Sequence, residues 1–482
     1  MAYPINGPLD TGASGYRNYG SGGLNNVGGN GNCWSFAPNS QTNARNLNFN
    51  SGNVNPLNNN ERAYGFSVRP SRALGTAAEG YYDVTMEYSF KELHRLVTVA
   101  YLKAREEERS KISQLDFETN VEDEIKKLTR SLHARTWRPQ PLDWFVNLFP
   151  TVREVFAPKF RDRVVSHVLF NLISPIFERY FVHDSFSCRV GKGTLVGIER
   201  LEYHIRSITD NYRHEAYSLN YDIRAYFMSI DRAILLDMIR ERLARHQHRF
   251  PDAIDYGFAD YLIETFLTRD PLEGCVYHGD PALIGLIRPG KSLRDQKPGV
   301  GIPIGDVLNQ LCSNIYLTAF DQFIHRVLHI KNAVRYVDDG KMLHRSREYL
   351  AECRGRADEF LRENLHLTLH PDKTTITNLS DTTYFLGAAL KPYRRYVCNE
   401  VADRFCDFIR FADEAAASGD MDSVAMLSEI NSHLGYLSHF DAKKIIGGAL
   451  SQATYLAEYF DFTKNYTKAI LKPKSICNDT HS

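Results

Sequence analysis

Two adjacent aspartates, Asp338 and Asp339, most constrain what this chain can fold into. They lie in the stretch 333–343 (AVRYVDDGKML), where apolar residues flank the acids on both sides and Gly340 follows them. Val, Tyr and Leu favour strands whereas Asp and Gly favour turns, so the pattern predicts a β-hairpin with both acids at its tip. Neighbouring carboxylates repel each other, and a divalent cation bound between them removes that cost. The stretch therefore indicates a cation site, with a solvated surface hairpin as the alternative.

A third aspartate, Asp222, ends an apolar segment far upstream. A carboxylate at a strand end can bind a metal ion together with hairpin acids and the nearby backbone carbonyl of Ile223. Nucleotidyl transfer uses such a site: one hard cation activates the attacking hydroxyl and another stabilises the leaving oxygen. We therefore predict that two Mg²⁺ ions, or Mn²⁺ instead, are held by Asp222, Ile223, Asp338 and Asp339.

Aromatic residues follow Asp222 after four and five residues. A ring at this distance along the chain can lie beneath the incoming sugar and exclude a 2′-hydroxyl by its bulk. We predict that Phe227 is this steric gate, with Tyr226 as the second choice, and that the other ring packs in the core. Tyr336 of the hairpin is also predicted to contact the nucleotide.

Basic residues suited to a triphosphate occur where a short apolar segment meets a helix start. Arg153 lies on the segment, and Arg161 and Arg163 lie at the beginning of the helix. Guanidinium groups bind phosphate through two parallel hydrogen bonds, so these three residues are candidate nucleotide ligands. Ion pairs with Glu154 and Asp162 are the alternative.

Two further polar residues are candidates for the chemistry. Gln310 follows a Gly- and Pro-rich loop and lies in the first turns of a helix, where its amide can touch the forming base pair. A helix-capping loop with no such contact is the alternative. Lys373 follows a short strand and can protonate the leaving pyrophosphate as a general acid, unless it is only a surface cation.

Composition separates an amino-terminal tail from a globular part. The first sixty residues contain 16 Asn and 10 Gly, a composition that does not build a packed core. We therefore expect a flexible tail over residues 1–85. From residue 86 onward, apolar residues recur at helical spacing, and the pattern is entirely helical from 399 to 470. One helix and a long loop are expected over about 232–298.

Charge and cysteine usage suggest the setting in which the chain works. A formal net charge of zero is unusual for a protein that grips nucleic acid alone, so we expect local basic grooves or a basic partner. The eight cysteines include no C-x-x-C pair, which argues against a zinc ribbon and for a reducing compartment. No apolar run of about 18 residues and no signal-peptide core occur. We expect a cytoplasmic protein without membrane contact.

In their order, these motifs resemble the motifs of reverse transcriptases over residues 86–470, including Tyr-Phe-Leu-Gly at 384–387. The resemblance implies an α+β right-hand polymerase with fingers, a palm built on an antiparallel sheet, and a helical thumb. The expected divisions are the tail (1–85), the amino-terminal helices and fingers (86–215), the palm (216–395, with a finger insertion at about 240–298), and the helical thumb with a carboxyl-terminal tail (396–482).

A narrower resemblance rests on Ile-Gly-Asp-Val-Leu-Asn-Gln at 304–310. Group II intron and retron relatives carry Gln-Gly-x-x-x-Ser-Pro there, whereas this segment is similar to the Ile/Leu-Gly-x-x-x-Ser-Gln form of diversity-generating retroelement reverse transcriptases. Segments 153–165, 191–194 and 290–293 are similar to the same group. Asn309 replaces the usual Ser, and Thr151 stands where relatives often have Lys.

This narrower resemblance implies error-prone copying of a template-repeat RNA into cDNA from dNTPs, with misincorporation opposite template adenines. It also implies a basic, oligomeric accessory variability protein and a prokaryotic or phage source. Residues 22–72 resemble a translated template repeat, which would explain their many Asn residues.

Two alternatives remain at the level of sequence. An antiphage defence reverse transcriptase shares the palm residues, and neighbouring genes would distinguish it. A catalytically idle RNA-binding scaffold is the other alternative, and the three acids argue against it because clustered negative charge repels RNA. No RNase H module or Cys/His endonuclease signature is evident.

Overall fold

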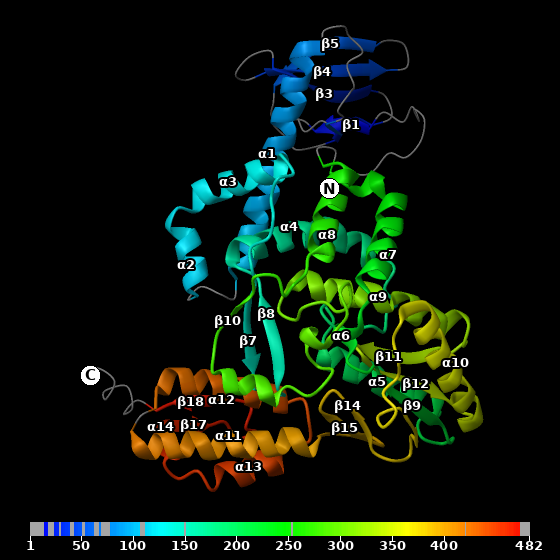
Figure 1. The fold of residues 1–482 in the computed structure, drawn as a ribbon, viewed down its shortest axis with the longest axis vertical. Coiled ribbons are helices and arrows are strands. Elements are labelled where there is room, and N and C mark those ends of the chain that lie inside the picture. The colour runs from blue at the N-terminus through cyan, green and yellow to red at the C-terminus, as the bar shows by residue number, and fades with distance from the viewer. Residues whose placement is uncertain are drawn as a thin grey trace. The chain divides into compact units, whose positions relative to one another are not determined.

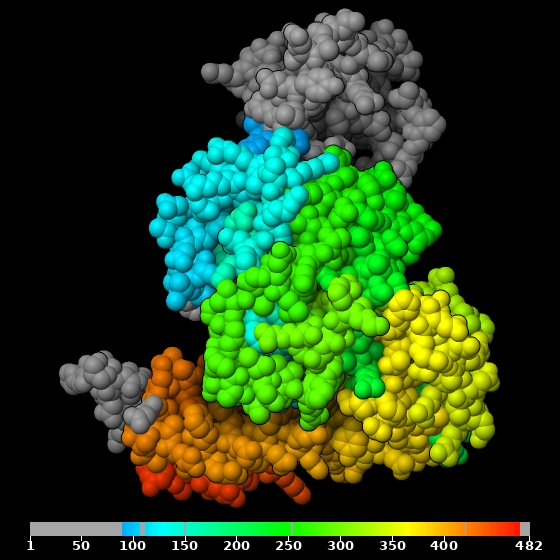
Figure 2. Space-filling model, viewed as in Figure 1, coloured from blue at the N-terminus to red at the C-terminus, as the bar shows by residue number. Residues whose placement is uncertain are grey.

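The computed structural model describes strands between residues 14 and 68 and the chain from 78 to 472, with gaps at 107–110, 149–150, 252–253 and 420. The chain divides into two compact units, Met1–Thr85 and Met86–Ser482 (Figure 1). Side chains are described from Ser89 onward. Figure 2 shows the carboxyl-terminal elements of the second unit, in orange and red, as one continuous part of its surface.

The described residues of the first unit form short strands and the first turns of α1 (Ala78–Ala104). Strands β1 and β2 pair antiparallel, and a second sheet has the order β5-β4-β3-β6. Side chains of this unit lie outside the described residues, so the flexible tail and the translated repeat stay predictions. The strands are β1 (Ser14–Arg17), β2 (Leu24–Val27), β3 (Asn30–Pro38), β4 (Asn43–Asn50), β5 (Val54–Glu61) and β6 (Ser67–Val68).

The second unit begins with helices and one small sheet. Helix α4 is its central element, because eleven of its residues are buried, most of them apolar. In the sheet, β7 pairs antiparallel with β8 and parallel with β10. These elements are α1 (Ala78–Ala104), α2 (Ile112–Thr119), α3 (Val121–His133), β7 (Asp143–Asn147), β8 (Arg153–Ala157), α4 (Phe160–Phe177), α5 (Thr194–Ile208) and β10 (Val276–Tyr277).

The largest sheet among the described residues of the second unit, here called the central sheet, is antiparallel and has the order β11-β12-β9-β13. Side chains alternate between its faces: Leu219 and Met342 pack in one apolar cluster, whereas Val334 and Leu343 pack in another. Figure 1 shows β9, β11 and β12 side by side with α10 next to them. The strands are β9 (Tyr217–Asp222), β11 (Asn332–Tyr336), β12 (Asp339–His344) and β13 (Thr375–Asn378).

The segment between β9 and β11 is more helical than predicted. One helix and a long loop were expected over 232–298, but a second helix, α8, is present. Asp255 caps its first turn by accepting a hydrogen bond from the Phe258 N–H at 2.6 Å, and Leu262 and Ile263 bury one face. The helices between β9 and β13 in the chain are α6 (Tyr226–Ser229), α7 (Arg232–Arg245), α8 (Tyr256–Thr268), α9 (Val307–Arg326) and α10 (Arg347–Leu365).

The carboxyl-terminal part consists of a small antiparallel sheet and a helical group. The prediction that residues 399–470 are entirely helical was wrong at the end, where β17 and β18 form a hairpin. The Asn431 side chain of α12 holds β18 by bonding both the N–H (2.8 Å) and the carbonyl (3.1 Å) of Ala469. The elements are β14 (Thr383–Phe385), β15 (Ala388–Lys391), β16 (Arg394–Val397), α11 (Asn399–Ser418), α12 (Ser423–Leu437), α13 (Lys443–Leu450), α14 (Leu456–Tyr459), β17 (Phe460–Phe462) and β18 (Ala469–Leu471).

The second unit is therefore a mixed α+β fold, as expected, whereas its arrangement as a right hand stays a prediction. Within the described residues, no helix is both long enough and apolar enough to cross a membrane.

Candidate active site

The hairpin of β11 and β12 carries the adjacent aspartates. Tyr336 pairs with Asp339, so Val337 and Asp338 form the tip and Asp339 begins the returning strand. The prediction that both acids lie at the tip was therefore wrong for Asp339, because strand pairing already begins at that residue. Val337 has a φ of 56°, a left-handed conformation that is rare for a β-branched residue. Its carbonyl accepts a hydrogen bond from the Arg335 guanidinium at 2.8 Å. The tip is thus held by a side chain from its own strand.

Arg335 is in turn fixed by helix α9. Its Nε and second terminal nitrogen donate to the two carboxylate oxygens of Asp321 at 2.7 and 2.6 Å. Both residues are buried. A bidentate pair of this kind allows little movement of the guanidinium. The position of the hairpin tip therefore depends on a contact with the helix behind the sheet.

The strand register brings Asp222 to the hairpin. Asp222, the last residue of β9, lies directly opposite Asp339 on β12. Side chains of directly opposed residues project from the same face of a sheet. The structure thus places Asp222 beside Asp339, with Asp338 adjacent at the tip.

Burial and mutual repulsion act on these carboxylates. Burial raises the pKa of Asp338, and the charge of Asp222 raises it further. Burial also raises the pKa of Asp339 to about 6, together with the charges of Asp338 and Asp222, although Lys341 opposes the change. Negative charge is therefore costly here, and a bound cation would offset the cost.

The oxygen atoms at this end of the sheet suit a hard cation. Ile223 and Leu369 form an isolated antiparallel bridge, and its hydrogen bonds are donated by the N–H groups of the adjacent residues Arg224 and His370. The Ile223 carbonyl therefore points away from Leu369, toward the β12 side. Mg²⁺ prefers such carboxylate and carbonyl oxygens. Among the described residues, however, no group of three or more His, Cys, Asp or Glu side chains forms a preassembled metal cluster. The donor chemistry fits Mg²⁺, and the full ligand set stays a prediction.

Lys373 reaches the same carboxylates from the turn before β13. Its Nζ donates to Asp222 Oδ2 at 2.8 Å, and its side chain is 58% exposed. An ion pair this exposed contributes little stability. Lys373 thus lies beside Asp222, and its role as a proton donor stays a prediction.

Sequence reasoning missed a second lysine, Lys341, on the same face of the sheet as the carboxylates. Lys341 is 4% exposed, and its Nζ donates to Asn220 Oδ1 at 2.5 Å. Burial lowers the pKa of Lys341 to about 8, against the opposing charge of Asp339. Lys341 lies two residues after Asp339, so strand alternation alone would have placed both on one face.

The absence of a side chain at Gly340 allows close packing on the buried face of the hairpin. A Cβ at this position would overlap the ring of Tyr221, the residue opposite it on β9. Tyr221 is buried and packs edge-to-face against Phe320 of α9, with ring centroids 5.6 Å apart. The glycine is thus required by close packing rather than by the turn itself.

The two aromatic residues after Asp222 have different surroundings. Tyr226 is buried, and its hydroxyl donates to the Ser313 carbonyl at 2.5 Å. Phe227 is partly buried, with its ring centroid 5.5 Å from that of Tyr226. Tyr226 is therefore a core residue, which leaves Phe227 as the candidate gate. Tyr336 is also partly buried and packs on the face with Val334.

The three arginines near β8 have different surroundings. Arg153 is exposed, and its Nε donates to Thr151 Oγ1 at 2.9 Å. Arg161 pairs with Asp162 at 3.2 Å, so the ion-pair alternative holds for this residue. Arg163 is partly buried on α4.

Glu154, the other acid that was considered as an ion-pair partner of these arginines, has a different role. Glu154 is buried, and its carboxylate accepts hydrogen bonds from the Ser292 hydroxyl at 2.9 Å and from the Leu293 N–H. It thereby fastens the loop that contains Gly290–Leu293 to β8, and it makes no ion pair with Arg153.

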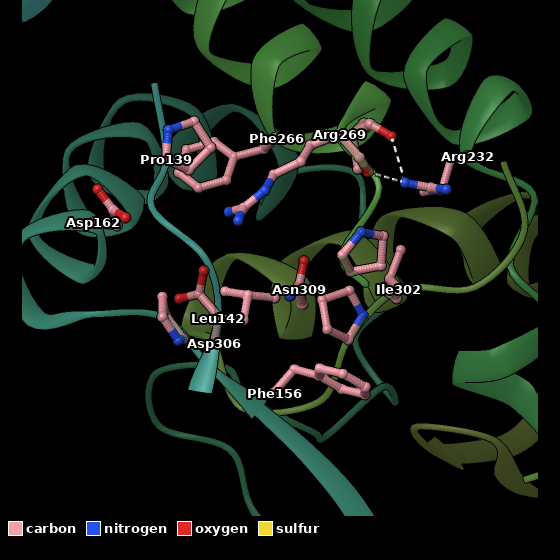
Figure 3. Close-up of a pocket in the computed structure, with 14 residues that line it drawn as sticks. Pro139, Leu142, Phe156, Asp162, Arg232, Phe266, Arg269, Ile302, Asp306 and Asn309 are labelled. Carbon is pink, nitrogen blue, oxygen red and sulfur yellow. Dashed lines mark hydrogen bonds between the residues drawn. The ribbon is translucent and has the colours of Figure 1, made fainter. Parts of the chain in front are cut away.

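Gln310 is exposed in the first turn of α9, which Asp306 caps. Asp306 is buried and accepts a hydrogen bond from Ser166 at 2.6 Å. A small cavity of about 50 Å³ lies next to this helix start, and Asn309 lines it whereas Gln310 does not. Figure 3 shows Arg269, Asp306 and Asn309 around the cavity.

No family model matches the chain. Protein YkfC of Escherichia coli strain K12 is 24% identical over an alignment of 275 residues, and the match covers 50% of this chain and 63% of YkfC. The chain therefore spans less than two thirds of that relative.

Two solved telomerase structures show a loose likeness. Apo telomerase from Candida tropicalis, truncated from its C-terminal domain, has a TM-score of 0.38 at 11% identity, covering 54% of this chain and 56% of that chain. Telomerase from Candida albicans in complex with a fragment of telomeric RNA has a TM-score of 0.39 at 11% identity, covering 71% and 60%. Such scores are too low to establish a shared fold.

Proposed function

We propose that this chain is an RNA-directed DNA polymerase that works with two divalent cations. The observation that carries the proposal is the register of the central sheet, in which Asp222 lies opposite Asp339 beside the hairpin tip that holds Asp338. A sheet end with this concentration of costly negative charge is suited to metal-assisted phosphoryl transfer.

In this proposal, each residue has a defined task. Asp222, Asp338, Asp339 and the Ile223 carbonyl would hold Mg²⁺ or Mn²⁺, and the ions would activate the primer hydroxyl and stabilise the departing pyrophosphate. Lys373 would leave Asp222 and donate a proton to the leaving group.

The remaining candidates would bind and select the nucleotide. Phe227 would exclude a 2′-hydroxyl beneath the incoming sugar, and Tyr336 would contact the nucleotide from the hairpin. Gln310 would touch the forming base pair. The triphosphate would be bound by Arg153 and Arg163, and by Arg161 once it leaves Asp162.

We further propose that the template is a repeat RNA and that copying is error-prone at template adenines, as in a diversity-generating retroelement. The support is the resemblance of segment 304–310 to that group. A net charge of zero is consistent with a basic accessory variability protein that helps to hold the RNA.

Sequencing of the cDNA tests this proposal. The purified chain is given a primed repeat RNA and dNTPs, with and without the accessory protein. Product with substitutions concentrated at template adenines is expected. Faithful product would contradict the retroelement function and favour the defence enzyme, and RNA binding with no product under any condition would favour the idle scaffold.

A further inference from the structure

A groove of about 450 Å³ lies away from the hairpin tip, at the opposite end of β9. It is formed by α5, the loop before β9, the turn between β15 and β16, and the connection between α12 and α13. Asp222 ends β9, whereas this loop leads into its first residue, Tyr217. Six residues of strand span about 17 Å or more between the two ends. The groove is therefore distinct from the candidate active site.

Three exposed cations line this groove: Arg206 on α5, Lys391 at the end of β15, and Arg394 at the start of β16. The Arg394 guanidinium donates to the Tyr396 hydroxyl at 3.0 Å, which orients it. The Lys391 Nζ lies 6.0 Å from the centroid of the same ring. Cations on three different elements thus face one concave surface.

The acidic residues of the groove do not cancel this charge. Glu202 is engaged by Arg395, which donates to both of its oxygens at 2.9 and 2.6 Å. Asp441 is the other acid in the lining, and its charge acts on Arg394. Two acids against four arginine and lysine side chains leave the groove positive.

Two tyrosines make the groove aromatic as well as basic. The rings of Tyr212 and Tyr393 meet edge-to-face, with centroids 5.0 Å apart and an interplanar angle of 63°. Both residues have left-handed backbones, with φ of 65° and 62°. The Tyr393 hydroxyl donates to the Asn211 carbonyl at 2.8 Å, yet its side chain is 73% exposed. An exposed ring held in place is a surface on which a base can stack.

We propose that this groove binds a single-stranded segment of nucleic acid outside the catalytic centre. Phosphates would lie on Arg206, Lys391 and Arg394, and a base would stack on Tyr393. Cations and exposed rings together are the features by which proteins hold single strands without reading their sequence. An acidic peptide would use the cations but would leave the exposed ring without a partner. The proposal does not depend on polymerase activity, because it concerns binding alone.

Binding of oligonucleotides by the whole chain, measured without dNTPs, tests the role of the groove cations. The probes are a fluorescent oligouridine and the matching oligothymidine of about 12 nucleotides. The double variant Arg206→Glu/Lys391→Glu is compared with Arg347→Glu/Arg354→Glu, which changes the charge equally on the exposed side of α10. We expect the groove variant to bind about tenfold more weakly and to show a shallower salt dependence, and the α10 variant to bind within twofold of the wild type.

Cross-linking locates the binding. An oligouridine that contains 4-thiouridine is irradiated on the chain, and the adducts are mapped by mass spectrometry. We expect an adduct in the peptide that contains Tyr393, lost in the groove variant and retained in the α10 variant. The thymidine strand then decides between RNA and DNA: equal affinity indicates recognition of phosphate and base alone, and weaker binding indicates a contact with the 2′-hydroxyl.

Substitutions of Tyr393 separate stacking from charge. Tyr393→Ala should weaken binding about fivefold or more without a change in salt dependence, whereas Tyr393→Phe should retain the wild-type affinity. The proposal is overturned if no adduct forms at the groove, or if the groove and α10 variants lose affinity equally. Preferential binding of a poly-glutamate peptide over both oligonucleotides would also overturn it and assign the groove to an acidic partner.

Discussion

Single residues at the hairpin are positioned by partners far away in the sequence. The aspartates could be predicted from sequence because they stand at a turn between apolar segments. Their supports could not, because the roles of Gly340 and Arg335 depend on Tyr221 and Asp321, which only the folded chain brings to them. The sequence around Lys341 does not indicate that this lysine is buried, apart from its position in the alternation of side chains along the strand.

Replacement of Gly340 by alanine should disrupt the site. The new Cβ would force Tyr221 out of its buried position, so we expect a loss of about 1–3 kcal/mol in the free energy of unfolding and a large loss of primer extension. Chemical denaturation measures the first effect. Gly355→Ala in the interior of α10 is the control, because its Cβ meets no atom within 4 Å and alanine favours a helix. Equal stability of the two variants would contradict this account.

Variants of the Arg335–Asp321 pair should separate the effect on stability from the effect on activity. Either Arg335→Met or Asp321→Leu alone leaves a buried charge without its partner and should cost about 3–5 kcal/mol. The double variant should recover much of that stability, because no unpaired charge remains. Primer extension should stay low, since the Val337 carbonyl has lost its donor. A double variant that regains full activity would show that Arg335 does not position the tip.

At the scale of elements, patterning predicts the strands and helices that carry strong local signals. The hairpin that carries Asp338 and Asp339 follows from its apolar flanks, but its tip does not, because the tip consists of Val337 and Asp338 and a β-branched Val is not a turn residue. Helix α8 and the β17–β18 hairpin were missed, because each depends on a side-chain hydrogen bond, from Asp255 in one case and from Asn431 in the other. Such bonds are made by residues that are common in loops.

Asp184 joins α5 to the central sheet and should make stability depend on pH. It accepts hydrogen bonds from His204 at 2.7 Å and Arg200 at 2.8 Å, and its backbone carbonyl accepts from the Arg335 N–H at 2.9 Å. Burial raises the pKa of Asp184, but the bonds from His204, His183 and Arg200 outweigh burial and lower the pKa overall.

Because the folded-state pKa of Asp184 lies below the unfolded value of about 3.9, its contribution is complete above that pH and is lost as the pH falls below it. Asp184→Asn should therefore cost about 2 kcal/mol at pH 7 and progressively less below about pH 4. Urea denaturation across this range measures the difference, with the exposed Asp237→Asn as the control. A cost that stays constant down to pH 3 would contradict the assignment.

At the scale of the molecule, the central sheet separates two apolar clusters, one on each face. The second cluster joins Val334 and Leu343 of the sheet to Phe385 and to the helices that follow. Sequence periodicity indicates that these helices are amphipathic, but not which apolar cluster they join. That choice depends on contacts between segments far apart in the chain.

Ending the chain after Val397 should therefore expose the apolar residues that the rest of the chain contributes to the second cluster. Loss of α11 to β18 removes more than half of the buried residues of that cluster, so we expect aggregation rather than a folded remainder. Light scattering and the soluble fraction measure this. A soluble monomer with a cooperative unfolding transition would show that the second cluster is dispensable.

The central claim is that Asp222, Asp338 and Asp339 act together as the ligands for catalytic cations. The most direct measurement is single-nucleotide incorporation into a primer on RNA, over a range of Mg²⁺ concentrations. The wild type is compared with Asp222→Asn, Asp338→Asn and the exposed Asp237→Asn. We predict Mg²⁺-dependent incorporation by the wild type and Asp237→Asn, and a loss of about a thousandfold or more in Asp222→Asn and Asp338→Asn at every Mg²⁺ concentration. Incorporation by folded Asp338→Asn at the wild-type rate would contradict the claim.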